Sequence, residues 1–363
     1  MRVVIAPDSF GGTLSSAQAA RAIAEGWSAA RPADELALAP QSDGGPGFVS
    51  VLAAQFGSRK TTFVQGPLGA ATKARWLIDA VGDSEHLVAY LECAQACGLH
   101  LLDGPPTPET ALAAHSRGVG QLIVDAVDYG ATTIVVGLGG SSCTDAGAGM
   151  LAVLGGLAQA RGILAGVGLI AATDVEHPLL GPSGAARVFG PQKGADAATV
   201  KLLEARLSSA AAEFQRVVKR DVASLPGAGA AGGLGAALFA LGASRRSGAE
   251  LIAERTGQSA LLARADLVIT GEGRLDDQSV RGKVVSALAK AAARAGARTI
   301  ALAGQVRLDP AQARIAGIAD AYSMSEFAGS VDLALTDAEN QLRKLAEHVA
   351  ANWTVANTKT ANH

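Results

Sequence analysis

Short apolar runs alternate along most of the chain with stretches that carry apolar residues every three or four positions. The runs have the length of buried strands, and the periodic stretches have the spacing of amphipathic helices. One such helix follows the first run, with a capping box at Ser15 and Gln18 and an apolar face on Ala20, Ile23 and Trp27. Strands are predicted at Val3–Ala6, Leu36–Ala39, Thr61–Val64, Ala74–Ile78, Leu87–Glu92, Thr132–Val136, Asp266–Thr270 and Thr299–Leu302.

This alternation predicts an α/β fold with a mostly parallel sheet. Further helices are expected through Phe48–Phe56, over Arg117–Tyr129 and Val280–Ala295, and from Thr336, where Glu339 completes a second capping box. The stretch 66–83 lacks helical periodicity and is typical of a hairpin. A second domain of mixed character is therefore expected to begin near residue 60.

Composition narrows the class of protein. The chain has 363 residues, of which 49% are hydrophobic and 18% charged, with a net charge of −2. These values favour a compact enzyme and give no basic surface for nucleic acid or anionic membrane. The stretch 222–244 is uncharged, but its Gly and Ala predict a buried loop and helix instead of a membrane span. Three cysteines and a first strand that meets Asp8 at once, leaving no room for a signal sequence, fit a reducing cytoplasm.

The segment Gly137–Asp145 is the strongest candidate for chemistry. It reads Gly-Leu-Gly-Gly-Ser-Ser-Cys-Thr-Asp between a predicted buried strand and a predicted buried helix. Glycines in such a turn let backbone N–H groups approach an anion, and the nearby hydroxyls and carboxylate suit phosphate and its cation. A tight turn with no ligand is the alternative interpretation of this segment taken alone.

Other polar clusters follow predicted strands, where open α/β sheets bind ligands. They are Pro7–Thr13, Ser42–Gly47 and Thr270–Ser279, and each places Gly beside an acidic residue. Two further segments stand apart from these. Phe189–Ala195 holds Lys193 in a Gly/Pro loop, and Gly227–Gly235 contains G-x-G-x-x-G without the preceding apolar strand that a dinucleotide site requires.

Taken together, these segments resemble the type I glycerate kinase family, the bacterial D-glycerate kinases. The family's A-P-D-S-F-K-G-T-L is met by Ala6–Leu14, and its A-D-G-G-E-G by Ser42–Gly47. The matches to G-G-S-A-T-N-D-G-G-A-G-M, D-V-x-N-P-L with F-G-P-Q-K-G-A, G-A-G-A-A-G-G-L-G and I-T-G-E-G-x-x-D-x-Q-S lie at Gly139–Met150, Asp174–Ala195, Gly227–Gly235 and Ile269–Ser279.

Four polar positions depart from the family pattern. Gly11 replaces the opening Lys, Pro46 replaces Glu, Thr144 replaces the Asn before the motif's Asp, and His177 replaces Asn. If the opening Lys binds an anion in the family, this chain must use another cation. The candidates for that cation are Lys193, Arg274 and Lys283.

The resemblance implies two α/β domains with the active site in the cleft between them. A flavodoxin-like domain would take residues 1–60 and 265–363. An inserted domain of restriction-endonuclease-like topology would take residues 61–264.

We therefore expect an ATP-dependent, Mg²⁺-requiring kinase that phosphorylates D-glycerate, most simply at the 2-hydroxyl. Asp276, with Glu272 as the rival, is the expected base, and Lys193 is expected to stabilise the transferred phosphoryl group. Asp43 and Asp145 are the candidate metal ligands. The remaining assignments are Arg274, Asp8, Ser9 and Gln192 for glycerate, and Gly139, Gly140, Ser141, Ser142, Gly229, Gly232, Gly233 and Lys283 for the phosphates of ATP.

Several alternatives stay open at this point. They are a glycerate 3-kinase, a kinase of another small hydroxy acid, a galactokinase-like enzyme, an NAD-dependent dehydrogenase resting on the Gly227–Gly232 motif, and a non-catalytic ligand-binding relative. Expected partners are small molecules, not nucleic acid or membrane. A homodimer is compatible with the sequence.

Overall fold

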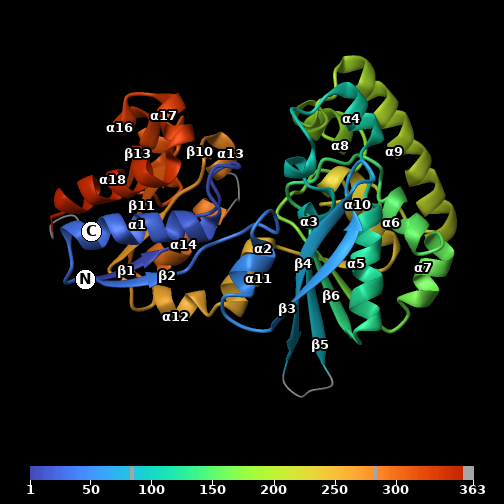
Figure 1. Cartoon of the computed structure of the whole chain (residues 1–363), viewed down its shortest axis with the longest axis horizontal. Helices are drawn as coiled ribbons and strands as arrows, with labels where there is room; N and C mark the ends of the chain where they lie inside the picture. Colours follow the sequence, from blue (N-terminus) through green and yellow to red (C-terminus); the bar gives the residue numbers. More distant parts are fainter. Residues whose placement is uncertain (82–85, 281–283, 355–363) are drawn as a thin grey trace. The chain divides into compact units, whose positions relative to one another are not determined.

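The computed structural model describes residues 1–81, 86–280 and 284–354 (Figure 1). The chain divides into two compact units. One combines Met1–Ser42 with the chain from Ala249 onward, and the other is Asp43–Gly248. Both are built on sheets with parallel strands, so the predicted α/β class is confirmed. The unit boundaries fall earlier in the sequence than residues 60 and 264.

The first unit contains a five-stranded sheet whose paired strands are all parallel, in the order β13-β11-β9-β1-β2. Alternate residues of its strands enter different cores. Val3 and Ile5 pack with one helical layer, whereas Val4 and Ala6 pack with the other. The strands are β1 (Arg2–Ile5), β2 (Glu35–Leu38), β9 (Leu267–Thr270), β11 (Arg298–Ala303) and β13 (Asp320–Ser323).

Helices α1 (Ser16–Ala30) and α18 (Ala338–Ala351) run side by side over one face of this sheet (Figure 1). The capping box of Ser15 and Gln18 forms as predicted. The second predicted capping box does not form. Thr336 ends helix α17 (Val331–Thr336) and donates its hydroxyl to the carbonyl of Asp332, so α18 begins two residues later.

The remaining elements of this unit are short, apart from one helix that packs on β9 and β11. They are α11 (Gly248–Arg255), α12 (Gln258–Leu262), α13 (Asp277–Val280), α14 (Val284–Arg294), α15 (Pro310–Ile315), α16 (Met324–Ala328) and the small parallel pair β10 (Arg274–Leu275) and β12 (Gln305–Val306). The helix predicted from Val280 is α14, which begins at Val284.

The second unit contains a six-stranded mixed sheet in the order β3-β4-β5-β6-β7-β8. Its first three strands are antiparallel, which confirms the predicted hairpin, and the strands from β5 to β8 pair in parallel. The strands are β3 (Ser58–Gln65), β4 (Ala71–Ala80), β5 (Leu87–Glu92), β6 (Thr133–Gly137), β7 (Gly168–Ala172) and β8 (Ser244–Arg246).

The helices of this unit explain its boundary. Helix α2 (Phe48–Leu52) packs on β4 and β5, so the residues that lead into β3 belong to this unit. The others are α3 (Ala94–Cys97), α4 (Pro108–Ala113), α5 (Arg117–Asp128), α6 (Ala148–Val153), α7 (Leu157–Ile163), α8 (Ala185–Phe189), α9 (Ala197–Val218) and α10 (Ala230–Ala240), with 3₁₀ turns at Leu99–Leu101 and Pro191–Lys193. In the described residues, no helix has both the length and the apolar character needed to cross a membrane.

The contact of α1 with α18 depends on a glycine. A Cβ on Gly26 would overlap the carbonyl oxygen of Arg343 and lie 3.0 Å from Cβ of Ala346. We predict that Gly26→Ala forces the helices apart and lowers the free energy of unfolding by about 1–3 kcal/mol. The control is Gly162→Ala in α7, where a Cβ meets nothing within 4 Å and helix propensity should add about 0.5–1 kcal/mol. Urea unfolding of both variants checks this. A Gly26→Ala protein as stable as the Gly162→Ala control would contradict the prediction.

Candidate active site

The loop after β6, Gly137–Ser142, packs backbone to backbone against the loop that begins the second unit, Asp43–Gly47. We call these the phosphate loop and the entry loop. The N–H of Gly139 donates to the carbonyl of Gly44 (3.1 Å). A Cβ on Gly137 would lie 2.5 Å from that carbonyl oxygen, and one on Gly139 would overlap Cα of Gly45. Only glycines allow the two loops to approach this closely.

Asp43 lies beside the phosphate loop and is half-buried. Its Oδ1 accepts the N–H of Gly45 (3.0 Å) and would lie 3.5 Å from a Cβ built on Gly139. Two predicted site residues from distant parts of the sequence are therefore neighbours. The carboxylate keeps acceptor capacity for water or a cation, because four hydrogen-bonding positions are available on its two oxygens.

The phosphate loop is partly committed to the protein's own hydrogen bonds. Ser142 directs both its N–H (2.7 Å) and its hydroxyl (3.0 Å) to the carbonyl of Cys97. The N–H of Gly139 is also used, as described above. Gly140 is exposed and has a φ of 73°. The expected cradle of open amides is consequently narrower than the sequence suggested.

Lys193 reaches the underside of this loop. Its Nζ donates to Oγ of Ser141 (2.9 Å) and to the carbonyl of Cys143 (2.7 Å), with only 3% of the residue exposed. Burial lowers the pKa of Lys193 below its usual value. Lys193 and the phosphate loop, which were each predicted to act on phosphate, are therefore in direct contact. The neighbouring Gln192 is exposed on the same 3₁₀ turn.

Asp145 is buried and its carboxylate accepts four hydrogen bonds. Oδ2 accepts the N–H (2.9 Å) and the hydroxyl (2.8 Å) of Ser116 and the N–H of Gly149 (3.0 Å), whereas Oδ1 accepts the N–H of Gly147 (3.1 Å). These bonds join the start of α6 to the residue before α5. Oδ2 is fully used by three donors, whereas Oδ1 accepts one N–H and keeps a free acceptor position, so most of the carboxylate's capacity is committed to the protein itself. We assign Asp145 a structural role.

The other predicted metal ligand, Asp43, fits better. The described residues contain no group of three His, Cys, Asp or Glu side chains that could hold a metal ion. Mg²⁺ bound with a nucleotide keeps several waters and needs only one or two protein carboxylates. A site built on Asp43, phosphate oxygens and water agrees with this geometry.

The glycines expected to bind ATP through G-x-G-x-x-G are buried within the second unit. A Cβ on Gly232 would overlap the carbonyl of Cys143, one on Gly233 would lie 2.9 Å from Cα of Ala146, and one on Gly229 would overlap the carbonyl of Pro178. The N–H of Ala146 donates to the carbonyl of Gly232 (3.0 Å). These glycines pack against Cys143 and Ala146, in the segment that follows the phosphate loop.

In the first unit, the clusters after β1 and β9 meet. The N–H of Asp8 donates to the carbonyl of Gly271 (2.8 Å), and Oδ1 of Asp8 accepts the N–H of Ser9 (2.7 Å). A Cβ on Gly273 would lie 3.1 Å from the backbone of Phe10 and of Gly11. Parallel strands that are neighbours in the sheet bring these loops together at their carboxyl ends.

Three of the residues expected to act on glycerate, Glu272, Arg274 and Asp276, lie on the second of these loops. Arg274 is exposed at the start of β10, and Glu272 and Asp276 are partly buried on either side of it. The N–H of Asp276 donates to Oγ of Ser279 (3.1 Å), whose hydroxyl donates to the carbonyl of Arg274 (3.3 Å). Lys283 lies outside the described residues.

Glu92 is a residue that the sequence analysis missed. It ends β5, is 1% exposed, and its Oε2 accepts the N–H groups of Gly47 (3.1 Å) and Val49 (3.2 Å). Burial raises the pKa of Glu92 to about 7, against the effect of these hydrogen bonds and one from Gln95. Its position could have identified Glu92 as a candidate from the sequence, because it ends an apolar strand. The other polar clusters were recognised because they follow the ends of strands.

The three cysteines are free and buried, as the sequence predicted. Sγ of Cys143 lies 3.6 Å from Sγ of Cys97, and Sγ of Cys93 contacts the carbonyl of Gly139 (3.5 Å). The hydrogen bond with Cys97 and burial raise the pKa of the Cys143 thiol well above its usual value. Against the hydrogen bond with Cys143, a hydrogen bond with Cys93 and burial raise the pKa of Cys97 as well, so the thiols of Cys97 and Cys143 are neutral packing groups next to the phosphate loop.

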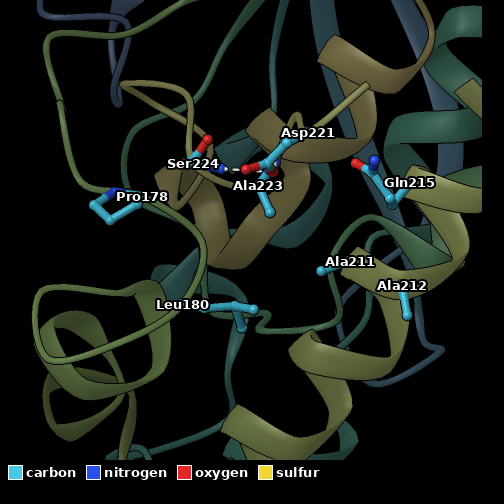
Figure 2. A pocket seen from close by; sticks show the side chains of 8 residues that line it. All are labelled: Pro178, Leu180, Ala211, Ala212, Gln215, Asp221, Ala223 and Ser224. Carbon is cyan, nitrogen blue, oxygen red and sulfur yellow. Dashed lines mark hydrogen bonds between the residues drawn. The ribbon is translucent and has the colours of Figure 1, made fainter. Parts of the chain in front are cut away.

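A pocket of about 740 Å³ opens elsewhere in the second unit (Figure 2). Its single carboxylate, Asp221, accepts the N–H groups of Ala223 (3.0 Å) and Ser224 (3.2 Å). No predicted site residue lines it. The lining residues are Pro178, Leu180, Ala211, Ala212, Gln215, Asp221, Ala223 and Ser224.

Comparison with known proteins identifies the family. The profile of the Glycerate kinase family matches residues 3–162 and 156–354. The chain belongs to this family. It is 36% identical to the glycerate 2-kinase of Escherichia coli K12 over 381 residues, covering 98% of each chain. It is 58% identical to an uncharacterised protein of Mycobacterium bovis over 351 residues, covering 97% of this chain and 91% of that protein.

The crystal structure of a protein assigned as glycerate kinase 2 from Salmonella typhimurium LT2 matches with a TM-score of 0.71 and 34% identity over 97% of both chains. The resemblance inferred from the motifs is confirmed, and this member of the glycerate kinase family is a kinase. Family membership decides against the dehydrogenase alternative, which agrees with the buried position of Gly229–Gly233.

The structural role of Asp145 can be tested by Asp145→Asn. One oxygen becomes an NH₂ group that faces backbone or hydroxyl donors, so we expect the free energy of unfolding to fall by about 1–3 kcal/mol. Asp43→Asn is the matched control, because the carboxylate of Asp43 is half-buried and accepts the N–H of Gly45 in an open loop. Calorimetric melting of both proteins checks this. A melting temperature of Asp145→Asn equal to that of Asp43→Asn would contradict the assignment.

Proposed function

We propose that this protein is an ATP-dependent kinase that transfers a phosphoryl group to the 2-hydroxyl of D-glycerate and releases 2-phosphoglycerate and ADP. The contact of buried Lys193 with Ser141 of the phosphate loop carries the proposal, because it holds a cation at the loop expected to bind phosphate. The relative from Escherichia coli, named glycerate 2-kinase, supports the substrate and the position of the hydroxyl.

Lys193 has the properties needed for its proposed role. Charge develops on the transferred phosphoryl group in the transition state, and a fixed cation in a site shielded from water stabilises that charge. The ammonium is held by two neutral oxygens, of Ser141 and Cys143, so it is preorganised and its charge is not offset by these partners. Gly140 gives a phosphate an exposed approach to the same loop.

Mg²⁺ would be held by Asp43, by phosphate oxygens and by water. When bound, it would offset phosphate charge. The backbone of Gly45 orients the carboxylate of Asp43 toward its own turn, beside Gly139. Asp145 is left out of this proposal because its carboxylate fixes α6 and Ser116.

Glycerate is assigned to residues of the first unit. The exposed guanidinium of Arg274 can bind a carboxylate through two parallel hydrogen bonds. Asp276 lies two residues away and is the proposed base, with Glu272 as the rival and Asp8 and Ser9 as further polar contacts. The 2-hydroxyl is bonded to the carbon next to the carboxylate, so a base near the anchoring arginine favours the 2-position over the 3-position.

Gly11 occupies the position of the family's lysine and has a φ of 52°. A Cβ would meet nothing within 4 Å there, so the positive φ and not a lack of space favours glycine. The cationic role of the missing lysine is assigned to Lys193 in this proposal.

The domain organisation is proposed in the same terms. Taken in chain order within the first unit, the strands β2, β1, β9, β11 and β13 have the order 2-1-3-4-5 of flavodoxin-like sheets. The mixed sheet of the second unit supports the inserted domain. A cytoplasmic location, a homodimer and an active site between the domains stay predictions.

The product identifies the reaction. The protein is incubated with ATP, Mg²⁺ and D-glycerate, and enolase is added without phosphoglycerate mutase. We expect phosphoenolpyruvate to form at once, because enolase uses 2-phosphoglycerate. A signal that needs the mutase would identify a 3-kinase. No ADP with D-glycerate would contradict the substrate, and a panel of small hydroxy acids in the same ADP assay would then reveal another one.

Lys193→Met tests the phosphoryl role. Methionine keeps the length of the buried side chain and removes its charge, so we expect the melting temperature to be kept while kcat falls by about 100-fold or more. Lys201→Met is the control, because Lys201 is exposed on α9 and its loss should leave kcat unchanged. The role is contradicted if Lys193→Met keeps kcat/KM within about threefold of the wild type.

A further inference from the structure

Glu92 is a buried carboxylate that the proposed reaction does not yet use. It belongs to the central part of the mixed sheet, where it pairs in register with Gly137, the first residue of the phosphate loop. Its side chain reaches the end of the entry loop and accepts two backbone N–H groups at the start of α2. Glu92 therefore contacts one loop through its side chain and lies beside the other through its strand.

The entry loop has close contacts with the phosphate loop along its length. The carbonyl of Gly44 accepts the N–H of Gly139, and Gly45 lies against Gly139. A Cβ on Gly140 would lie 2.6 Å from Cγ of Pro46. Glu92 fixes the end of the same loop, at Gly47 and Val49. The position of Asp43 relative to the phosphate loop consequently depends on how firmly the carboxylate holds that end.

A charged acceptor holds backbone N–H groups more strongly than a neutral one does. Burial raises the pKa of Glu92 to about 7, so the carboxylate gains its charge near neutral pH. Gln95 donates its Nε2 to Oε1 of Glu92 (3.3 Å) and accepts the N–H of Arg75 (3.3 Å) through its own Oε1. Each oxygen of Glu92 thus has a donor from a neutral group.

Ionisable groups on the packed elements are few near this carboxylate. Helix α2 and strand β6 carry none. The side chain of Asp125 on α5 accepts the hydroxyl of Thr62, and that of Arg117 donates to Gln65. The others on these elements are Lys73, Arg75 and Asp79 on β4, Tyr90 on β5, Asp128 on α5, and the buried thiols of Cys93 and Cys97.

We infer that Glu92 is a positioning residue of the kinase: its ionised carboxylate holds the entry loop so that Asp43 stays in place beside the phosphate loop. The effect on the reaction rests on the proposed function. The effect on the entry loop rests on the hydrogen bonds of Glu92 alone. Protonation of Glu92 weakens the hold, and the rate of phosphoryl transfer falls with it.

The test is Glu92→Gln, which keeps the shape of the side chain and fixes it in a neutral form. We expect kcat of the wild type to rise between pH 6 and pH 8.5 through a step near pH 7, and the variant to lack that step. The two proteins should agree within about twofold at pH 6 and differ about tenfold at pH 8.5, the ratio expected from loss of one charge-assisted bond. KM for D-glycerate should change less than about twofold, because glycerate is assigned to other residues.

A second measurement does not need turnover. Amide hydrogen exchange of Gly47 and Val49, followed by NMR at pH 8, should be about tenfold faster in the variant. The matched control is Glu204→Gln, since Oε1 of Glu204 on α9 accepts the N–H of Gly181 (2.8 Å) in the same unit. That control should keep the pH step and the exchange at Gly47 and Val49.

The outcomes separate the two proposals. A pH step that persists in Glu92→Gln, or unchanged exchange at Gly47 and Val49, overturns the positioning role. Wild-type protein that makes no ADP with D-glycerate overturns the proposed function, and the exchange measurement still decides whether Glu92 holds the entry loop. Equal effects of Glu92→Gln and Glu204→Gln on kcat at pH 8.5 would also overturn the inference.

Discussion

The candidate site of the second unit depends on the absence of Cβ atoms where two loops meet. A Cβ on Gly137 would collide with the carbonyl of Gly44, and a Cβ on Gly139 with the backbone of Gly45. Backbone contact of this kind fixes both loops without the rotational freedom of side chains. The carboxylate of Asp43 is then held in place relative to strand β6, which ends at Gly137. Glycine thereby acts here as a means of rigid contact between loops.

A second layer of hydrogen bonds maintains that contact. Asp145 joins the start of α6 to Ser116, Ser142 is tied to the carbonyl of Cys97, and Glu92 holds the end of the entry loop. These side chains are polar and buried, and each is supplied with partners, which is the condition for polar groups to be tolerated in a core. The residues closest to a phosphate are thus few, and most of the motif's polar residues support them.

The sequence predicted the fold class because its strands are short, apolar and followed by periodic helices. It predicted Lys193 and Asp43 as site residues from their motifs, and in the structure both lie beside the phosphate loop. It assigned Asp145 to a metal because an acidic residue after a Gly-rich turn has the same pattern whether it binds an ion or caps a helix. The two roles are distinguished only by the N–H groups of Ser116 and Gly149 that surround the carboxylate. Ser116 is distant in the sequence, and Gly149 lies one turn further on.

The surroundings of Glu92 and of the Gly229–Gly233 segment could not be predicted from the sequence, for a related reason. A strand that ends in glutamate gives no sign of which N–H groups surround its carboxylate, since Gly47 and Val49 are brought there by tertiary packing. The G-x-G-x-x-G spacing predicts an open loop only when a strand precedes it. In this chain Gly232 and Gly233 instead pack closely against the backbone of Cys143 and Ala146. Thr336 shows that a capping prediction can also fail locally. It was expected to cap α18, but it is the last residue of the preceding helix, α17.

The buried ammonium of Lys193 has a consequence for proton exchange with solvent. Its two hydrogen bonds go to neutral oxygens, and burial disfavours its charged form. An anion that arrives at the phosphate loop would restore the preference for the charged form. Anion binding at alkaline pH is therefore coupled to uptake of a proton, so that affinity for a phosphate group declines as hydroxide concentration rises, even though the phosphate itself keeps its charge. The lysine makes the unliganded protein a weaker base and the liganded protein a stronger one.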